Sequence, residues 1–212
     1  MEFLRQASQI EGLYVPLLYK TDYDEEGLIK SFAPLYEAVP EVIRRQVVTE
    51  MDEVNFINKP VVPFIKVTQD RVVLELMRGC IRGCRFCQAG FVYRPLREHS
   101  VEYLKNYALT MLEITGAEEI SLSSLSSSDY SNLGKLLEFL FEYTGKHGIN
   151  ISLPSLRIDA FSLDIMKRVQ DVKKSSLTFA PEAGSQRLRD VINKGISEED
   201  IIGGAMQAFR GG

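Results

Sequence analysis

The segment RGCIRGCRFCQAG, residues 78–90, holds all three cysteines of the chain, at Cys80, Cys84 and Cys87. An odd number of cysteines gathered in one segment does not build a disulfide framework, which needs pairs spread along the chain. In a reducing compartment such a cluster indicates metal or redox chemistry. The spacing C-x3-C-x2-C is therefore the starting point for predicting both the site and the fold.

Three thiolates from one loop can bind three irons of a [4Fe–4S] cluster and leave the fourth iron open. Iron–sulfur clusters are ligated by cysteine, and an open coordination position admits a substrate. Gly79, Gly83 and Gly90 let the loop fold tightly around a bulky inorganic group. Three alternatives are weaker. Zinc needs a fourth ligand, for which His99 is the nearby option; a ferredoxin-type cluster needs a fourth cysteine; and the cysteines could be buried structural residues.

The bulk composition excludes several classes of protein. The 212 residues carry a formal charge of −4, with 45% hydrophobic and 25% charged residues, as in ordinary soluble domains. No apolar run is long enough for a membrane span, and residues 1–10 lack the apolar core of a signal peptide. We therefore expect a cytoplasmic protein with no membrane partner. The mild acidity gives no strong signal for nucleic-acid binding.

Strands and helices alternate along most of the chain. Apolar, β-branched runs predict strands at 61–67, 71–77, 120–125, 149–153 and 176–180. Helices are predicted from Ser100 to Gly116, from Ser131 to Gly145 or Gly148, over about 162–169, over 185–193, and after the capping-box pair Ser197 and Asp200. This order predicts a parallel sheet with helices outside it, joined by right-handed crossovers.

The first 66 residues differ from the rest because they contain five of the eight prolines. Proline breaks long elements, so we predict one short helix over 40–51 among extended and turn segments. Residues 1–66 are expected to be a linker or accessory segment without a core of its own, and residues 67–212 a separate core.

Three segments carry a resemblance to a known superfamily. The cysteine spacing with Phe86 before the last cysteine resembles the radical S-adenosylmethionine (SAM) superfamily. Residues 80–95, 152–159 (SLPSLRID) and 177–195 (LTFAPEAGSQRLRDVINKG) are similar to B12-binding-type radical SAM proteins of unassigned reaction. The resemblance covers the whole chain. It implies a partial parallel (β/α) barrel with about four of six units, incomplete at its C-terminus and preceded by the exit of a cobalamin-binding-like domain.

The resemblance also implies an activity. A [4Fe–4S] cluster on the three cysteines would bind SAM at its open iron and cleave it reductively to a 5′-deoxyadenosyl radical. That radical would abstract hydrogen from an unknown substrate, small or macromolecular, with electrons supplied by a donor such as flavodoxin or ferredoxin. Cobalamin is compatible with the resemblance, but the chain shows no recognisable ligand for it. The alternatives are an iron–sulfur or electron-transfer module without turnover and an inactive fragment.

Further cofactor contacts are expected after the predicted strands, because barrel sites lie at the C-terminal strand ends. Ser124 stands where the superfamily often has a Gly-Gly-Glu-like stretch, and Ser124 or Ser126 could accept from the SAM amino group; a polar loop that caps the Ser131 helix is the alternative. Arg157 could pair with the SAM carboxylate or form a surface salt bridge. Glu182 and Ser185 could contact SAM, although Glu182 could also favour a helix N-terminus. Phe86, beside the cysteines, completes the set.

The remaining charged residues of the segment are less specific. Arginines at 78, 82, 85, 94 and 97 make the cysteine loop basic. They could offset the charge of a thiolate-ligated cluster, attract an anionic substrate, or be solvated. His99 and His147 are expected at the surface.

Overall fold

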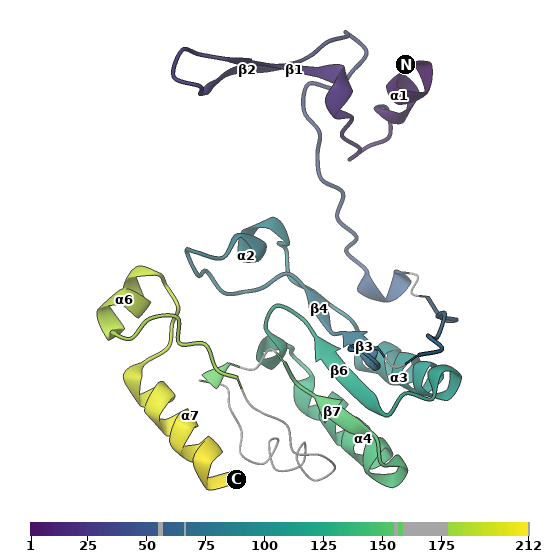
Figure 1. The fold of residues 1–212 in the computed structure, drawn as a ribbon, viewed down its shortest axis with the longest axis vertical. Helices are drawn as coiled ribbons and strands as arrows, with labels where there is room; N and C mark the ends of the chain where they lie inside the picture. Colours follow the sequence, from purple (N-terminus) through teal and green to yellow (C-terminus); the bar gives the residue numbers. More distant parts are fainter. Residues whose placement is uncertain (55–56, 66, 155–156, 159–177, 212) are drawn as a thin grey trace. The chain divides into compact units, whose positions relative to one another are not determined.

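The computed structural model describes residues 1–54, 57–65, 67–154, 157–158 and 178–211 (Figure 1). The chain forms two compact units, unit 1 over Met1–Thr49 and unit 2 over Glu50–Gly212. The expected N-terminal segment, residues 1–66, therefore includes unit 1 and the first part of unit 2. Among the described residues, no helix has the length and apolar character needed to cross a membrane.

Unit 1 is a small hairpin with its own apolar core. It contains helix α1 (Glu2–Ala7), the 3-10 turn η1 (Pro16–Leu18), and strands β1 (Tyr19–Tyr23) and β2 (Ile29–Pro34), which pair antiparallel. The buried core comprises Val15, Leu18, Tyr19 and Val39. The expectation that this region has no core was therefore wrong.

Two elements predicted near the start of the chain do not form. Residues 40–50 are irregular where a helix was predicted, and only the short 3-10 turn η2 (Met51–Glu53) follows. Val42 and Val48 are exposed while Ile43 packs on the unit 1 core, so the apolar residues do not form one helical stripe, and β-branched residues are poor helix formers without one. The strand predicted over 61–67 is also wrong for its described residues: Val61 and Phe64 lie in solvent and pair with no strand.

The centre of unit 2 is a parallel sheet covered by two helices (Figure 1). Strands β3 (Val72–Glu75), β6 (Glu119–Ser123) and β7 (Asn150–Ser152) lie in the order β3-β6-β7, all parallel. Helix α3 (Val101–Thr115) connects β3 to β6, and α4 (Leu133–His147) connects β6 to β7. The fold is thus mixed α/β with the parallel sheet of a partial (β/α) barrel, as expected.

The two covering helices form for local and tertiary reasons. Ser100 Oγ accepts a hydrogen bond from Tyr103 N at 3.1 Å and caps α3, while Gly116 ends it with φ 64°. Helix α4 starts after Asn132, two residues later than Ser131, and ends at Gly148 with φ 67°. Both helices bury apolar stripes against the sheet; the core comprises Leu104, Ala108, Met111, Leu136, Leu137 and Leu140 with Val72, Leu74, Ile120, Leu122 and Ile151.

The other elements of unit 2 surround the ends of the strands. Strands β4 (Met77–Arg78) and β5 (Arg97–Glu98) pair antiparallel and flank the cysteine segment, which includes helix α2 (Gln88–Val92). Helices α6 (Gln186–Val191) and α7 (Glu198–Gly211) end the chain. The helix predicted over 162–169 and residues 176–177 of the last predicted strand lie outside the described residues, and residues 178–180 form no strand.

Candidate functional site

The cysteine loop leaves the sheet at the C-terminal end of β3 and returns through β5. Gly79 lies at the start of the loop with φ 90°, a conformation that L side chains rarely adopt. A Cβ atom there would lie 2.8 Å from the carbonyl oxygens of both Tyr93 and Pro95. The two limbs of the loop therefore touch at Gly79, and only glycine fits between them.

The three thiols are free and lie at different depths. Cys84 is buried, whereas Cys80 and Cys87 are partly exposed. The backbone N–H of Arg82 donates to Cys80 Sγ at 3.4 Å, and that of Gly90 donates to Cys87 Sγ at 3.4 Å. Hydrogen bonds of this kind tune the sulfur ligands of iron–sulfur clusters.

The donor set fits a cluster better than a single ion. Within the described part of the chain, no three His, Cys, Asp or Glu side chains gather as ligands of one metal ion. On a cluster each thiolate would bind a different iron, so the three sulfurs would surround one compact group. Three soft sulfur donors from one glycine-containing loop, two of them receiving N–H bonds, match iron–sulfur chemistry.

His99, the zinc ligand considered above, has another role. It was expected at the surface, but it is only 2% exposed, so that expectation was wrong. Its Nδ1 lies 3.0 Å from Asp52 Oδ1, and its ring stacks on Tyr103 at a centroid distance of 4.5 Å. The pKa of Asp52 is lowered: burial opposes the shift, but hydrogen bonds from Ser100 and His99 outweigh it. His147 is exposed, as expected.

The end of helix α6 docks on the cysteine loop. Arg85 N donates to Ile192 O at 2.9 Å, and Asn193 Nδ2 donates to Gly83 O at 2.9 Å. Arg85 also donates through Nη1 to Val191 O. Segments more than one hundred residues apart in sequence are thereby joined at the loop that carries the cysteines.

Lys194 brings two of the predicted site residues together. Its Nζ donates to Glu182 Oε1 at 3.1 Å and lies 5.9 Å from the centroid of the Phe86 ring. The Lys194 side chain is only 13% exposed. Glu182 itself has φ 67°, which is strained for a residue other than glycine. The ion pair holds this carboxylate beside the cysteine loop.

The serine-rich loop after β6 forms hydrogen bonds among its own residues. Ser124 Oγ lies 3.0 Å from Ser127 Oγ and accepts from Ser126 N at 3.2 Å. Arg157 N donates to Ser128 Oγ at 2.9 Å, which joins the loops after β6 and β7. The structure thus places Ser124 in a local hydroxyl network.

The other two predicted contacts lie near the α6 loop. Arg157 Nη2 reaches the carbonyl oxygens of Lys194 and Gly195 at 3.4 Å. Ser185 Oγ accepts from Leu188 N at 3.3 Å and caps α6. Arg157 therefore lies against the segment that carries Lys194, while the Ser185 hydroxyl serves the helix.

Sequence reasoning assigned no role to several residues that organise the site. Asp129 binds Arg82, Asn193 binds the loop backbone, and Lys194 joins Glu182 to Phe86. One signal was available for Asn193: asparagine before Lys-Gly at a helix end is typical of a left-handed residue, and its φ is 53°. The ion pairs have no comparable local signal.

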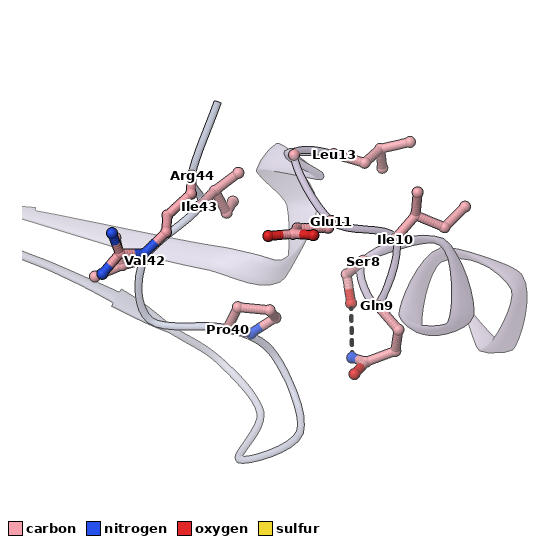
Figure 2. A pocket seen from close by; sticks show the side chains of 10 residues that line it. Ser8, Gln9, Ile10, Glu11, Leu13, Pro40, Val42, Ile43 and Arg44 are labelled. Carbon is pink, nitrogen blue, oxygen red and sulfur yellow. Dashed lines mark hydrogen bonds between the residues drawn. The ribbon is translucent and has the colours of Figure 1, made fainter. Parts of the chain in front are cut away.

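A pocket in unit 1 is separate from these residues (Figure 2). Residues 8–13 and Pro40, Val42, Ile43 and Arg44 line it, and its volume is about 190 Å³. That volume is below the range of typical small-molecule sites, and none of the predicted site residues lines it.

The parallel sheet with a three-cysteine loop beyond the C-terminal end of β3 is the arrangement of a partial (β/α) barrel. The family model of the Radical SAM superfamily matches residues 74–212. The chain belongs to this superfamily, since the match covers more than half of it.

Three curated relatives extend the comparison. The chain is 39% identical over 129 residues to an uncharacterised protein of Methanocaldococcus jannaschii, covering 61% of this chain and 28% of that protein. It is 27% identical over 137 residues to the "Putative methylthiotransferase" of the same organism, with 60% and 30% covered. It is 25% identical over 199 residues to the "Uncharacterized methyltransferase" of Pyrococcus horikoshii, with 85% and 38% covered. The matches thus span less than two fifths of each relative's length.

Proposed function

We propose that this chain is the core of a radical SAM enzyme that binds a [4Fe–4S] cluster through Cys80, Cys84 and Cys87. When bound, the cluster would supply one electron that cleaves the S–C5′ bond of SAM, giving methionine and a 5′-deoxyadenosyl radical. The main support for the proposal is the cysteine loop, which follows the C-terminal end of β3. It holds all three thiols, and two of their sulfurs accept backbone N–H bonds. Cobalamin enters no step of this proposal.

The chain's own residues would bind and orient SAM. We propose that Arg157 holds its carboxylate and that Glu182, kept in place by Lys194, accepts from its hydroxyl or amino groups. Phe86, Ser124 and Ser185 are the further proposed contacts. Ser124 and Arg157 follow strands β6 and β7, at the end of the sheet where barrel sites gather. Glu182 and Phe86 both lie close to Lys194 beside the cysteine loop.

The proposal names no substrate. For the reaction class, the names of two relatives indicate what to test first. The printed names of two relatives refer to methylthio and methyl transfer, so these transfers are the first to test. We also propose an acidic redox protein of the flavodoxin or ferredoxin kind as electron donor. Exposed Phe91 and Tyr93 beside the basic cysteine loop support such a partner. A cytoplasmic location, where thiols stay reduced, belongs to the same proposal.

Anaerobic reconstitution tests this function. The purified chain is loaded with iron and sulfide, supplied with SAM and a strong reductant, and analysed for methionine and 5′-deoxyadenosine. Both products should form in the wild type and be lost in Cys84→Ser, while Glu142→Gln, in an exposed ion pair on α4, should retain them. A stable cluster without product would instead support an electron-transfer module, and absence of iron uptake would support an inactive fragment.

A further inference from the structure

A partly buried ion pair, with the Arg82 side chain 36% exposed, joins the cysteine loop to the loop that follows β6. The carboxylate of Asp129, whose side chain is 7% exposed, accepts from Arg82 Nε at 2.9 Å and from Nη2 of the same guanidinium. Ser126 Oγ donates to the carboxylate at 2.8 Å. A two-bond fork fixes the plane and direction of a guanidinium, which a single contact does not.

Arg82 lies between the first two cysteines, and its backbone is held as well. Its N–H donates to Cys80 Sγ at 3.4 Å, and its carbonyl accepts from Arg94 Nη2 at 3.1 Å. Anchoring the side chain therefore orients a peptide N–H toward a cysteine sulfur.

The ion pair is charged at neutral pH. Burial alone would raise the pKa of Asp129, but hydrogen bonds from Arg82 and Ser126 and the charges of Arg82 and Arg157 outweigh it, so the pKa is lowered. Removing Arg82 would leave the buried Asp129 carboxylate without its main compensating charge, whereas removing Asp129 would free the more exposed Arg82 guanidinium. The carboxylate oxygens are also engaged, which makes Asp129 a poor candidate for direct contact with a ligand amino group.

We propose that Asp129 is a positioning residue for the cysteine loop. Through the guanidinium fork it holds the Arg82 N–H on Cys80 Sγ and keeps the segment around Cys80 closed, so that loss of the fork exposes Cys80 more than Cys87. In the cluster-bound protein the same hydrogen bond raises the reduction potential, because donors to a ligating sulfur stabilise the reduced cluster. This second effect rests on the proposed function; the first concerns the metal-free chain alone.

Alkylation of the metal-free, reduced protein by iodoacetamide tests the first effect. Mass spectrometry gives the modification rates of Cys80 and Cys87 separately. In Asp129→Asn the ratio of the Cys80 rate to the Cys87 rate should rise by about threefold or more, because the segment around Arg82 opens locally. The exposed-pair variant Glu142→Gln should keep the wild-type ratio. An unchanged ratio in Asp129→Asn overturns the proposal.

A second variant guards against general unfolding. If Asp129→Asn accelerates both cysteines equally, Arg82→Lys decides, because lysine keeps the charge but cannot form the fork. A raised ratio in Arg82→Lys supports the proposal, and a wild-type ratio overturns it.

A redox titration of the reconstituted protein, followed by electron paramagnetic resonance, tests the second effect. The potential should be more negative in Asp129→Asn than in the wild type and in Glu142→Gln. Equal potentials overturn the second effect. A wild-type chain that takes up no cluster overturns the proposed function and the second effect together, whereas the alkylation ratio still decides the first.

Discussion

Arg189 is a charged residue that is buried in the protein. It is 2% exposed. Its Nε donates to Ile196 O at 3.0 Å, its Nη1 to the carbonyls of Ala183 and Gly184 at 3.0 and 3.2 Å, and its Nη2 to Gln186 Oε1 at 2.9 Å. Only a guanidinium has enough N–H groups in a fixed plane to serve these acceptors. Arg189 thus braces the loops on both sides of α6.

Replacing Arg189 by leucine should destabilise the protein by about 1–3 kcal/mol, because the buried Ile196 carbonyl and the partly buried acceptors Ala183 and Gly184 lose their donor. Urea denaturation followed by circular dichroism measures the change. Arg187→Leu, on the exposed side of the same helix, is the matched control and should stay near wild type. Equal losses in the two variants would contradict the bracing role.

Tyr130 should make stability sensitive to alkaline pH. Burial, with smaller effects of Glu98 and Asp52, raises its pKa to about 12, and its hydroxyl donates to His99 O at 2.9 Å. The unfolded tyrosine ionises near its ordinary value of about 10. The stabilisation that Tyr130 provides is therefore complete below about pH 10 and is lost as the pH rises toward the pKa of the folded state.

Tyr130→Phe should lower stability by about 1 kcal/mol at neutral pH, the net value of one hydrogen bond. Urea denaturation from pH 7 to 11 should show this difference shrinking above about pH 10, because phenylalanine has no proton to lose. A difference that stays constant across the range would refute the assignment to Tyr130.

At the residue scale, the features that could be predicted were those determined by residues close together in the sequence. The three cysteines and the glycine-rich turn form one continuous signal, so the loop was found. Asp129 and Lys194 were given no role because their partners lie 47 and 12 residues away. The sequence alone does not distinguish a solvated charged side chain from one that forms a buried ion pair. His99 was misplaced for the same reason, since its partner Asp52 is also 47 residues distant.

At the element scale, the correct predictions were those in which an apolar periodicity and a boundary residue occurred together. For α3 and α4 the apolar period agrees with a Ser or Gly boundary, and both helices form between β3, β6 and β7. Residues 40–51 bury Met51 and partly bury Ile43 without forming the predicted helix, and the described residues Val61 and Phe64 of the second segment lie in solvent. Because a sheet or helix needs something to pack against, composition alone misled there. The predicted helix over 162–169 remains a prediction.

The N-terminus of α7 shows how one pair of residues starts an element. Ser197 Oγ accepts from Asp200 N at 3.1 Å, and Ser197 N donates to Asp200 Oδ2 at 2.9 Å, so the predicted capping box is confirmed. These hydrogen bonds from the Ser197 backbone and side chain lower the pKa of Asp200. The box therefore persists at neutral pH and is lost as the pH falls through the lowered pKa.

Ser197→Ala should weaken the start of α7 by about 1 kcal/mol, the usual effect of losing an N-cap. Hydrogen exchange resolved by peptide should show faster exchange in the first turn of α7, with α3 unchanged. Ser197→Thr keeps the hydroxyl and should exchange like the wild type. Unaltered exchange in the alanine variant would show that tertiary contacts alone hold this helix end.

At the scale of the whole molecule, two units have separate apolar cores. Leu18 is fully buried in unit 1, and Leu122 is fully buried in the sheet of unit 2. The α/β class and the parallel order were predictable because they follow from the alternation of elements. The small core of unit 1 was not, since its prolines and short strands give no periodic pattern.

Separate cores predict separate responses to cavities. Leu122→Ala should cost about 2–5 kcal/mol and speed hydrogen exchange across unit 2. Leu18→Ala should speed exchange in unit 1 only. Parallel losses of protection in both units from either variant would show that the cores unfold as one.

The hydrogen bond from Asn193 to Gly83 spans 110 positions of the chain, which has a consequence for synthesis. On a ribosome adding roughly 5–20 residues per second, Asn193 is made about 5 to 20 s after Gly83. During that interval strands β6 and β7, at residues 119–152, are also being made, and the cysteine loop lacks its docking partner. Until then Gly83 and Arg85 lack the hydrogen bonds to residues 193 and 192 that hold them in the folded protein. The docked form of the cysteine loop is therefore completed only after residue 193 has been made.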